Sequence, residues 1–411
     1  MIKNNHLPVN LVIIGSGHYS TGHTVLSGNK ITDKDFGVLL PSAFHLRSLG
    51  KVGQIYVCGR DGNKFDSIRK KITPWTIDQH IDISFNSFPS SGTVDAKAYI
   101  QALDEIPKPC AALIAVPDNL HVDVMLECAR RDIPFLVVKP AVTNLDDYYL
   151  VKASLNSDLL TLVDYHKVYD ESNLLIMEDL ENNIYGKIHH ISSLMSQRRD
   201  MIEIYVRWLK ENPKININHY LGSHYIHLTG FLTKAIPIDV RAIQQFGFIQ
   251  NKYKIDVADT IQTQIRWKAK SGYIFASHHN AGWSDPSETE SMTFQQMHLL
   301  TENGHVFSDQ RYRGTRKVLS GSGLQAPNPY FFNMTKNLLG EWNLQTKYGY
   351  QSIENFINLL GHKQNKFNDF HLPTFDESEN VTAILEAADK SLNNNSSVVT
   401  IVRKDQRFYL N

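Results

Sequence analysis

The chain has 411 residues, and its 42 Lys plus Arg balance 42 Asp plus Glu, giving no formal net charge at pH 7. This length predicts two domains, and the balanced charge argues against nucleic acid or a membrane surface as an electrostatically bound partner. The three cysteines, Cys58, Cys110 and Cys128, form no CxxC pair, so we expect neither a disulfide framework nor a metal site, and a reducing cytoplasm is the expected location.

Alternating strands and helices are predicted for the N-terminal part of the chain. The first apolar run, Leu11 to Ile14, is too short for a signal peptide or a membrane span. Strands are expected at Leu11 to Ile14, Gln54 to Cys58, Ala111 to Val116 and Phe135 to Val138. Helices are expected at about Ala43 to Leu49, Val94 to Leu103 and Val122 to Arg131. This alternation predicts a doubly wound parallel sheet over residues 1–142.

Strand-like segments then follow one another closely, which predicts a largely antiparallel sheet in a second α/β domain over residues 143–411. The segments are HHISSLM, DVRAIQQFGFI, DTIQTQIRWKA, GYIFASHH and TFQQMHLLT, with turns at residues 270–272 and 302–304. A helix at Glu377 to Leu392 and a strand at Ser397 to Val402 are expected near the end.

A glycine pair directly follows the first predicted strand. Gly15 and Gly17 stand where a dinucleotide phosphate loop needs a tight turn and a close backbone approach to the pyrophosphate. Ser20 occupies the place of the third glycine, and the polar stretch 21–36 separates the loop from the next convincing helix. An ordinary loop is the alternative interpretation.

The second predicted strand ends in Val57-Cys58-Gly59-Arg60-Asp61. An acidic residue at this point accepts the ribose hydroxyls of NAD, whereas a nearby arginine accommodates the phosphate of NADP. Gly59 stands at the acidic position and Arg60 follows it, which favours NADP. Asp61 keeps NAD open, and a solvated turn is the third interpretation.

Three further loops carry polar side chains. The loop Val116-Pro117-Asp118-Asn119-Leu120-His121 follows one strand, Lys139-Pro140 ends the buried strand Phe135 to Val138, and Val163 to Lys167 ends another apolar run. Ligands of open α/β sheets bind at the carboxyl ends of strands. Lys139 is therefore either a functional group at this edge or a solvated residue at a strand end.

The segment NHYLGSHYIHLTGFL places Tyr220, His224, His227 and Phe231 at spacings of three and four. On a helix these residues share one face. A buried histidine in such a place is a candidate for acid/base chemistry or a structural core residue.

Together these segments resemble the glucose-fructose oxidoreductase and inositol dehydrogenase family, often called Gfo/Idh/MocA. VVKPAVTN is similar to the family's Glu-Lys-Pro stretch, and LGSHYIHL is similar to its Asp-x-Gly-x-His-x-x-Asp-Leu helix. The resemblance extends to TENGHVFSDQRYRG and DESENVTAILEAADKSL. Val138, Tyr220 and His227 replace the family's glutamate and two aspartates, and Lys214-Ile215-Asn216 replaces its glycine run.

The resemblance implies a Rossmann domain that binds NADP, with NAD as the alternative, and a C-terminal domain with a large, open, mostly antiparallel sheet. It implies a sugar, nucleotide-sugar or cyclitol dehydrogenase that forms homo-oligomers through that sheet. The implied catalytic residues are Lys139, His224 and Tyr220, although Tyr220 could instead only pack against the sheet. The implied cofactor-binding residues are Gly15, Gly17, Ser20, Gly59, Arg60, Pro117, Asp118, His121, Lys139 and Pro140. The implied substrate-binding residues are His166, Lys167, Arg198 and His227.

Two other functions remain open. Some relatives are non-catalytic and sense a nucleotide or sugar while binding a partner protein. Others are glycosidases that retain tightly bound NAD.

Overall fold

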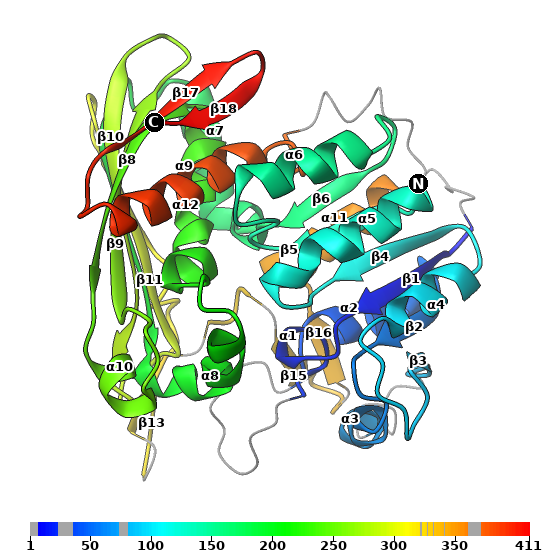
Figure 1. The fold of residues 1–411 in the computed structure, drawn as a ribbon. Helices are drawn as coiled ribbons and strands as arrows, with labels where there is room; N and C mark the ends of the chain where they lie inside the picture. Colours follow the sequence, from blue (N-terminus) through cyan, green and yellow to red (C-terminus); the bar gives the residue numbers. More distant parts are fainter. Residues whose placement is uncertain are drawn as a thin grey trace. The chain divides into compact units, whose positions relative to one another are not determined.

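The computed structural model describes residues 7–23, 36–73, 81–320, 323–326, 328–331, 333–340, 342–360 and 371–411. They form two compact units, drawn in Figure 1. Unit 1 comprises Met1–Val138, Leu150–His166 and Tyr330–Phe375, and unit 2 comprises Lys139–Tyr149, Lys167–Pro329 and Asp376–Asn411. The expected boundary at residue 142 lies beside the first of these breaks. Two segments that were expected in the second domain, Leu150–His166 and Tyr330–Phe375, belong to unit 1.

Unit 1 contains a six-stranded parallel sheet with the order β3-β2-β1-β4-β5-β6. Its strands are β1 (Val9–Ile14), β2 (Val52–Cys58), β3 (Asn86–Phe88), β4 (Cys110–Ile114), β5 (Phe135–Val138) and β6 (Thr161–Asp164). This is the strand order of the dinucleotide-binding Rossmann fold, so the predicted doubly wound sheet is confirmed. The apolar runs are continuous because both faces of such a sheet are covered.

Helices of unit 1 alternate with these strands. They are α1 (His18–Thr21), α2 (Leu39–Ser48), α3 (Lys64–Ile72), α4 (Ala98–Glu105), η2 (Asp118–Leu120) and α5 (His121–Arg130), followed later by α11 (Tyr348–Leu359). Helix α6 (Leu145–Ser154) spans a break between the units. The helix expected from Val94 begins only at Ala98, because the backbone of Val94 pairs with Asp61 in an isolated bridge. Of the insertion at 21–36, residues 24–35 lie outside the described part.

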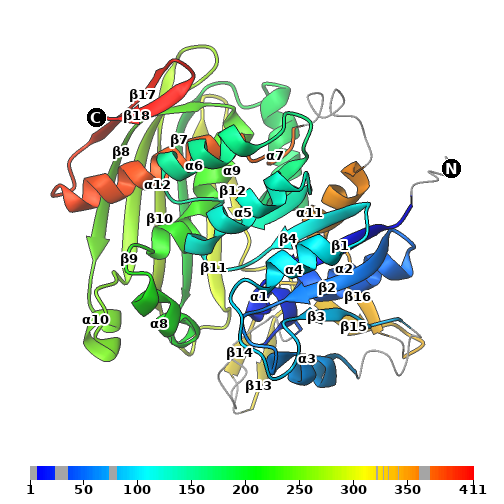
Figure 2. The ribbon, with the colours of Figure 1, turned by 45° about the vertical axis from the view of Figure 1, so that its right-hand side comes forward.

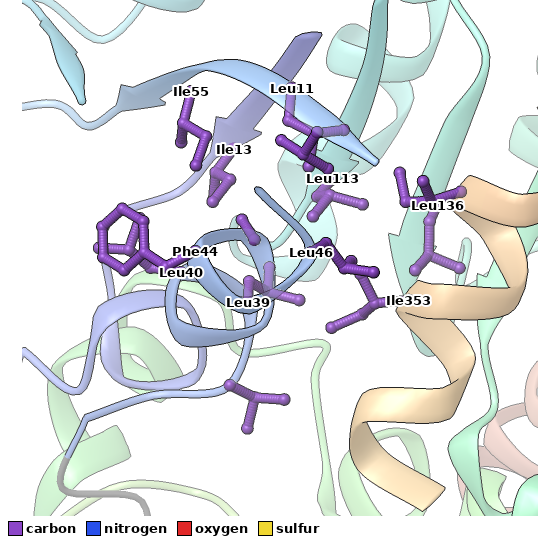
Figure 3. Packing of buried hydrophobic residues seen from close by; sticks show 14 of the residues in the cluster. Leu11, Ile13, Leu39, Leu40, Phe44, Leu46, Ile55, Leu113, Leu136 and Ile353 are labelled. Atoms are coloured by element: carbon purple, nitrogen blue, oxygen red, sulfur yellow. The ribbon is translucent and has the colours of Figure 1, made fainter. Parts of the chain in front are cut away.

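The core of unit 1 lies between its sheet and two helices distant in sequence. Leu39, Leu40, Phe44 and Leu46 of α2 face strand residues such as Ile13 in Figure 3, which also draws Ile353 of α11 beside them. All of these side chains are at most 2% exposed. A hairpin, β15 (Asn333–Lys336) with β16 (Trp342–Gln345), precedes α11.

Unit 2 contains an eight-stranded sheet with the order β12-β11-β7-β10-β9-β8-β17-β18. Its strands are β7 (Ile188–Arg198), β8 (Ile236–Gln245), β9 (Thr260–Lys268), β10 (Ile274–Asp285), β11 (Thr293–Thr301), β12 (His305–Asp309), β17 (Val399–Lys404) and β18 (Arg407–Leu410). Only β7 and β10 pair in parallel; the other neighbours are antiparallel. The expected mostly antiparallel sheet is therefore confirmed.

The remaining elements of unit 2 are mainly helical. They are η3 (His166–Tyr169, which begins at the last residue of a unit 1 segment), α7 (Glu171–Glu181), η4 (Arg199–Met201), α8 (Ile202–Glu211), η5 (Asn218–Gly222), α9 (Ser223–Thr233), α10 (Phe248–Tyr253), α12 (Ser378–Asn393) and the hairpin β13 (Lys317–Leu319) with β14 (Gly323–Gln325). The end of the expected strand DVRAIQQFGFI is helical, because α10 begins at Phe248. Among the described helices, none combines the length and the apolar character needed to cross a membrane.

Candidate functional site

The glycine loop of unit 1 follows β1 at the carboxyl edge of the parallel sheet. Gly15 has φ +116°, and a Cβ there would lie 2.1 Å from the carbonyl oxygen of Ala115, so only glycine fits. Gly17 is exposed, and a Cβ on it would meet nothing within 4 Å. The loop backbone is therefore tight at Gly15 and open at Gly17, as a pyrophosphate-binding turn requires.

The loop continues into the single turn of α1 rather than into a long helix. Ser20, in the place of the third glycine, is fully buried, and its hydroxyl has no hydrogen-bond partner among the described residues. Its side chain therefore does not reach the open side of the loop in this conformation.

The residues after β2 lie at the same edge. Gly59 donates its backbone N–H to Phe88, Arg60 is exposed, and the carboxylate of Asp61 accepts a hydrogen bond from the backbone N–H of Asn63 at 3.0 Å. Arg60 is thus accessible, while Asp61 caps the following turn.

The loop after β4 is held by a buried histidine. Pro117 is exposed and Asp118 is half-buried, but His121 is fully buried and its Nε2 lies 3.0 Å from the carbonyl oxygen of Val116. His121 therefore fixes the shape of this loop from inside and does not face solvent.

A polar cluster lies at the end of β6, where the sequence indicated the polar segment Val163 to Lys167 but not its partner Tyr19. The hydroxyl of Tyr19, on α1, donates to the buried carboxylate of Asp164 at 2.6 Å. Burial, together with that carboxylate, raises the pKa of Tyr19 well above its ordinary value. His166 lies beside Asp164, 3.9 Å between Nδ1 and Oδ1, and packs against the rings of Phe331 and Tyr348. The predicted His166 thus belongs to a cluster with Tyr19 and Asp164 within unit 1.

Lys139 follows the last residue of β5 directly and belongs to unit 2. Its ammonium group donates to the carbonyl oxygen of Tyr220 and lies 4.7 Å from the centre of the Tyr220 ring. Pro140, the next residue, is buried. Two catalytic candidates, Lys139 and Tyr220, are therefore in direct contact.

Tyr220 sits in the π-helical turn η5, not in a regular α-helix. The single helical face expected for Tyr220, His224, His227 and Phe231 holds only from His224 onward, because a π-turn has a different residue spacing. The rings of His227 and Phe231 do meet, 5.4 Å apart. His224 and His227 are both buried on α9.

An aromatic cluster surrounds Tyr220. Its hydroxyl is 2.6 Å from the hydroxyl of Tyr205, and its ring stacks on Trp283 at 5.9 Å. Trp208 contacts the ring at 6.3 Å. These neighbours hold Tyr220 in one orientation, with its hydroxyl paired to a second phenol.

Lys167 is the most deeply buried cation of the candidate set, 2% exposed. Its ammonium donates to the side-chain oxygens of Gln295, at 2.6 Å, and Gln310, and lies 4.6 Å from the ring centre of Tyr225. Burial lowers its pKa to about 7; Asp170 opposes this, while the charges of Arg313 and Lys139 reinforce it.

The carboxylate of Asp170 binds other groups. It accepts from Arg313, from the side-chain amide of Gln310 at 2.8 Å, and from the backbone N–H of Ser172 at 3.1 Å. Lys167 is therefore held by two neutral amides within a network that sequence reasoning missed. The only signal was the segment SDQRYRG, which supplies Gln310 and Arg313.

Arg198, at the end of β7, is engaged by a neighbour. Its guanidinium binds Asp200 through two hydrogen bonds, of 3.1 and 2.5 Å. Among the described residues, no cluster of three or more His, Cys, Asp or Glu side chains has the geometry to hold a metal ion.

No known family model and no curated protein matches the sequence. Solved structures match the fold over nearly the whole chain. Myo-inositol 2-dehydrogenase from Lactobacillus plantarum shares 14% identity with a TM-score of 0.70, covering 96% of this chain and 100% of that one. Scyllo-inositol dehydrogenase from Lactobacillus casei, solved with NAD(H) and scyllo-inositol, shares 12% sequence identity with a TM-score of 0.66. The match covers 96% of this chain and 99% of that one.

An aldose-aldose oxidoreductase from Caulobacter crescentus, complexed with glycerol, shares 11% identity at a TM-score of 0.65, covering 96% of this chain and 99% of that one. At such identities the likeness establishes the fold alone. The motif resemblance is thereby confirmed at that level: the chain has the fold of the Gfo/Idh/MocA proteins.

Proposed function

We propose that this chain is a nicotinamide-dependent oxidoreductase that acts on a hydroxyl or carbonyl carbon of a sugar, nucleotide sugar or cyclitol. The observation that carries the proposal is Lys139, which directly follows β5 and is held by Tyr220 through its ammonium group. The glycine loop and the inositol dehydrogenase fold support it.

Unit 1 is the proposed holder of the dinucleotide. The tight turn at Gly15 and the open backbone at Gly17 fit a pyrophosphate, and exposed Arg60 fits an additional phosphate on the ribose. We therefore propose NADP, with NAD as the alternative that the NAD(H)-bound scyllo-inositol dehydrogenase supports. Bound nicotinamide supplies hydride chemistry.

Unit 2 is the proposed source of the proton-transfer groups. When a carbinol carbon gives up hydride, its hydroxyl proton must leave toward a group within hydrogen-bond reach. We assign His224 as that acid/base and Lys139 as the cation that stabilises negative charge on the oxygen. In the reductive direction the same groups return the proton. Tyr220 positions Lys139 through its carbonyl oxygen and ring.

The test is turnover by the purified chain with NAD or NADP and a panel of free polyols, aldoses and nucleotide sugars, followed in the reduced-nicotinamide absorbance band. Lys139→Ala should lower turnover by on the order of 100-fold and change cofactor affinity much less. Lys187→Ala, which removes an exposed lysine, is the matched control. Near-native turnover of the Lys139 variant would refute the catalytic assignment.

The same measurements separate the alternatives. Cofactor binding without turnover on any sugar would favour the non-catalytic sensor. The replacement of the family's three acidic residues by Val138, Tyr220 and His227 supports that alternative. Release of a cleaved glycoside without net cofactor turnover would favour the NAD-assisted glycosidase.

We further propose that the chain forms homo-oligomers through the large sheet of unit 2. Exposed apolar side chains on the outward face of that sheet support this, among them Phe307 and Ile274, both 55% exposed, Leu300 and Ile243. The proposed location is a reducing cytoplasm, with which the three buried free cysteines agree.

A further inference from the structure

One face of the large sheet in unit 2 is packed against helices, and the other is bare. Helices α9 and α12 lie on one side of the sheet in Figures 1 and 2, which draw no described helix over the opposite side. The turn η5 contacts α9 and the strands β10 and β7. Burial alternates accordingly: along β9, Ile261, Thr263, Ile265 and Trp267 are buried and the residues between them are exposed. We call this bare side the open face.

Four histidines from four neighbouring strands lie on the open face. They are His305 of β12, His298 of β11, His190 of β7 and His278 of β10. Two neighbouring rows of paired residues cross β12, β11, β7 and β10 in that order. The residues of the first row are His305, Leu300, His190 and Ala276. The residues of the second row, two positions away along each strand, are Phe307, His298, Ser192 and His278. Each histidine is therefore diagonal to the next, and the four form a zigzag across the sheet.

The distances between the imidazole rings agree with this zigzag. The centroids of His190 and His278 are 4.9 Å apart, and those of His298 and His305 are 5.7 Å apart. Burial, followed by the charges of His278 and His298, lowers the pKa of His190. A positive charge on His278 or His298 thus disfavours a proton on His190.

The charged side chains of the open face include Asp309, Arg266, Lys268, Arg241 and Glu302, and Arg241 donates to the carbonyl oxygen of Ser396. Asp309 accepts from the backbone N–H groups of Arg311 and Tyr312. Arg266 is paired with Asp239, and Glu302, in the β11–β12 turn, accepts from the backbone N–H of Lys187. The side chains directly opposite the histidines are Leu300, Ala276, Ser192, Phe307 and Gln264, none of which carries a charge.

The open face has the size of a stable interface. The six strands from β12 to β8, taken as ~4.8 Å wide and about nine residues long at ~3.3 Å each, give on the order of 850 Å². A standard interface takes about 800 Å² from each partner. Apolar Phe307, Leu300, Ile274 and Ile243 are spread over the same face.

We infer that the four-histidine open face binds a second copy of this chain and releases it when its histidines are protonated. This rests on the homo-oligomer proposed above and is independent of the redox assignment. A second copy fits because a two-fold interface sets the same patch against itself. Neutral imidazoles among apolar side chains pack against their own kind without repulsion. Imidazolium groups bring like charges together, and none of the side chains directly opposite them in the sheet is a carboxylate.

Sedimentation velocity of the full chain at pH 7.5 and pH 5.5, without cofactor or substrate, tests the inference. We expect a dimer or higher species at pH 7.5 and association weakened by on the order of 100-fold at pH 5.5. The triple variant His190→Gln, His278→Gln, His298→Gln should remain associated at both pH values. His189→Gln, which alters an exposed histidine of the same strand that is not part of the zigzag, should behave like the native chain.

Phe307→Lys provides a second test that needs no histidine change. It should be monomeric at pH 7.5, with an unchanged far-ultraviolet circular dichroism spectrum. A native chain that is monomeric at pH 7.5, an association equal at both pH values, or a histidine variant that still dissociates at pH 5.5 would overturn the inference. Cofactor turnover is measured separately, so failure of this inference and failure of the proposed oxidoreductase function remain distinct.

Discussion

Replacing Lys167 by methionine should change how the stability of unit 2 depends on pH. Burial lowers the pKa of this lysine from 10.5 to about 7, and two glutamine oxygens are its hydrogen-bond acceptors. The unfolded chain binds the proton more tightly than the folded chain does. The cost of burying the charge is therefore largest at and below pH 7 and disappears as the pH rises toward 10.5.

The magnitude follows from the two pKa values. Between pH 7 and pH 9 this linkage raises the free energy of unfolding by about 2 kcal/mol in the native chain. Lys167→Met removes that increase, because a thioether has no proton to lose. At pH 7 the Lys167→Met variant is stabilised by the loss of the buried charge, but the oxygen of Gln295 loses its lysine donor, at a cost of about 1–3 kcal/mol. The oxygen of Gln310 still accepts from the hydroxyl of Tyr225 at 3.1 Å. The difference between the two pH values isolates the titration.

Urea unfolding at pH 7 and pH 9, followed by tryptophan fluorescence, measures this difference. Trp208, Trp267 and Trp283 all lie in unit 2 and report on it. Lys210→Met, at an exposed position, should respond to pH as the native chain does. If the free energy of unfolding rises equally in Lys167→Met and in the native chain between pH 7 and pH 9, the pKa of Lys167 is not lowered and the reasoning fails.

Three further predictions concern the proposed sites. Gly15→Ala should destabilise unit 1 by roughly 2 kcal/mol or more in thermal unfolding, because its Cβ meets Ala115 and its φ is positive; an unchanged midpoint would contradict the described turn. Arg60→Ala should weaken NADP binding about tenfold and leave NAD binding unchanged by calorimetry; equal losses would remove Arg60 from the phosphate site. Tyr220→Phe should lower turnover less than about threefold, because Lys139 is held by the carbonyl oxygen and the ring rather than by the hydroxyl; a loss near 100-fold would make that hydroxyl a reacting group.

The sequence predicted the parallel sheet well, because its signals are local. The run Phe135 to Val138 is apolar throughout, and β5 spans those four residues. Gly15 was recognisable because a strand directly precedes it. These features depend on neighbours in the chain and on the period of the pattern.

Features that depend on distant residues were not predictable. The burial of Lys167 requires Gln295 and Gln310, more than a hundred residues away. The bond from Tyr19 to Asp164 likewise joins segments far apart in the chain. The π-turn at Tyr220 has no local sequence rule, and the helical spacing of NHYLGSHYIHL favours an ordinary helix there.

Helix α11 is synthesised long after the helix against which it packs. Its residue Ile353 belongs to the same buried cluster as Leu40 and Phe44, which are synthesised some three hundred residues earlier. A ribosome adds about 5–20 residues each second, so α2 waits on the order of 15–60 s for the helix that packs beside it. During that interval all of unit 2 up to Pro329 is translated. Until α11 emerges, the apolar side chains of the cluster that pack against it lack that contact.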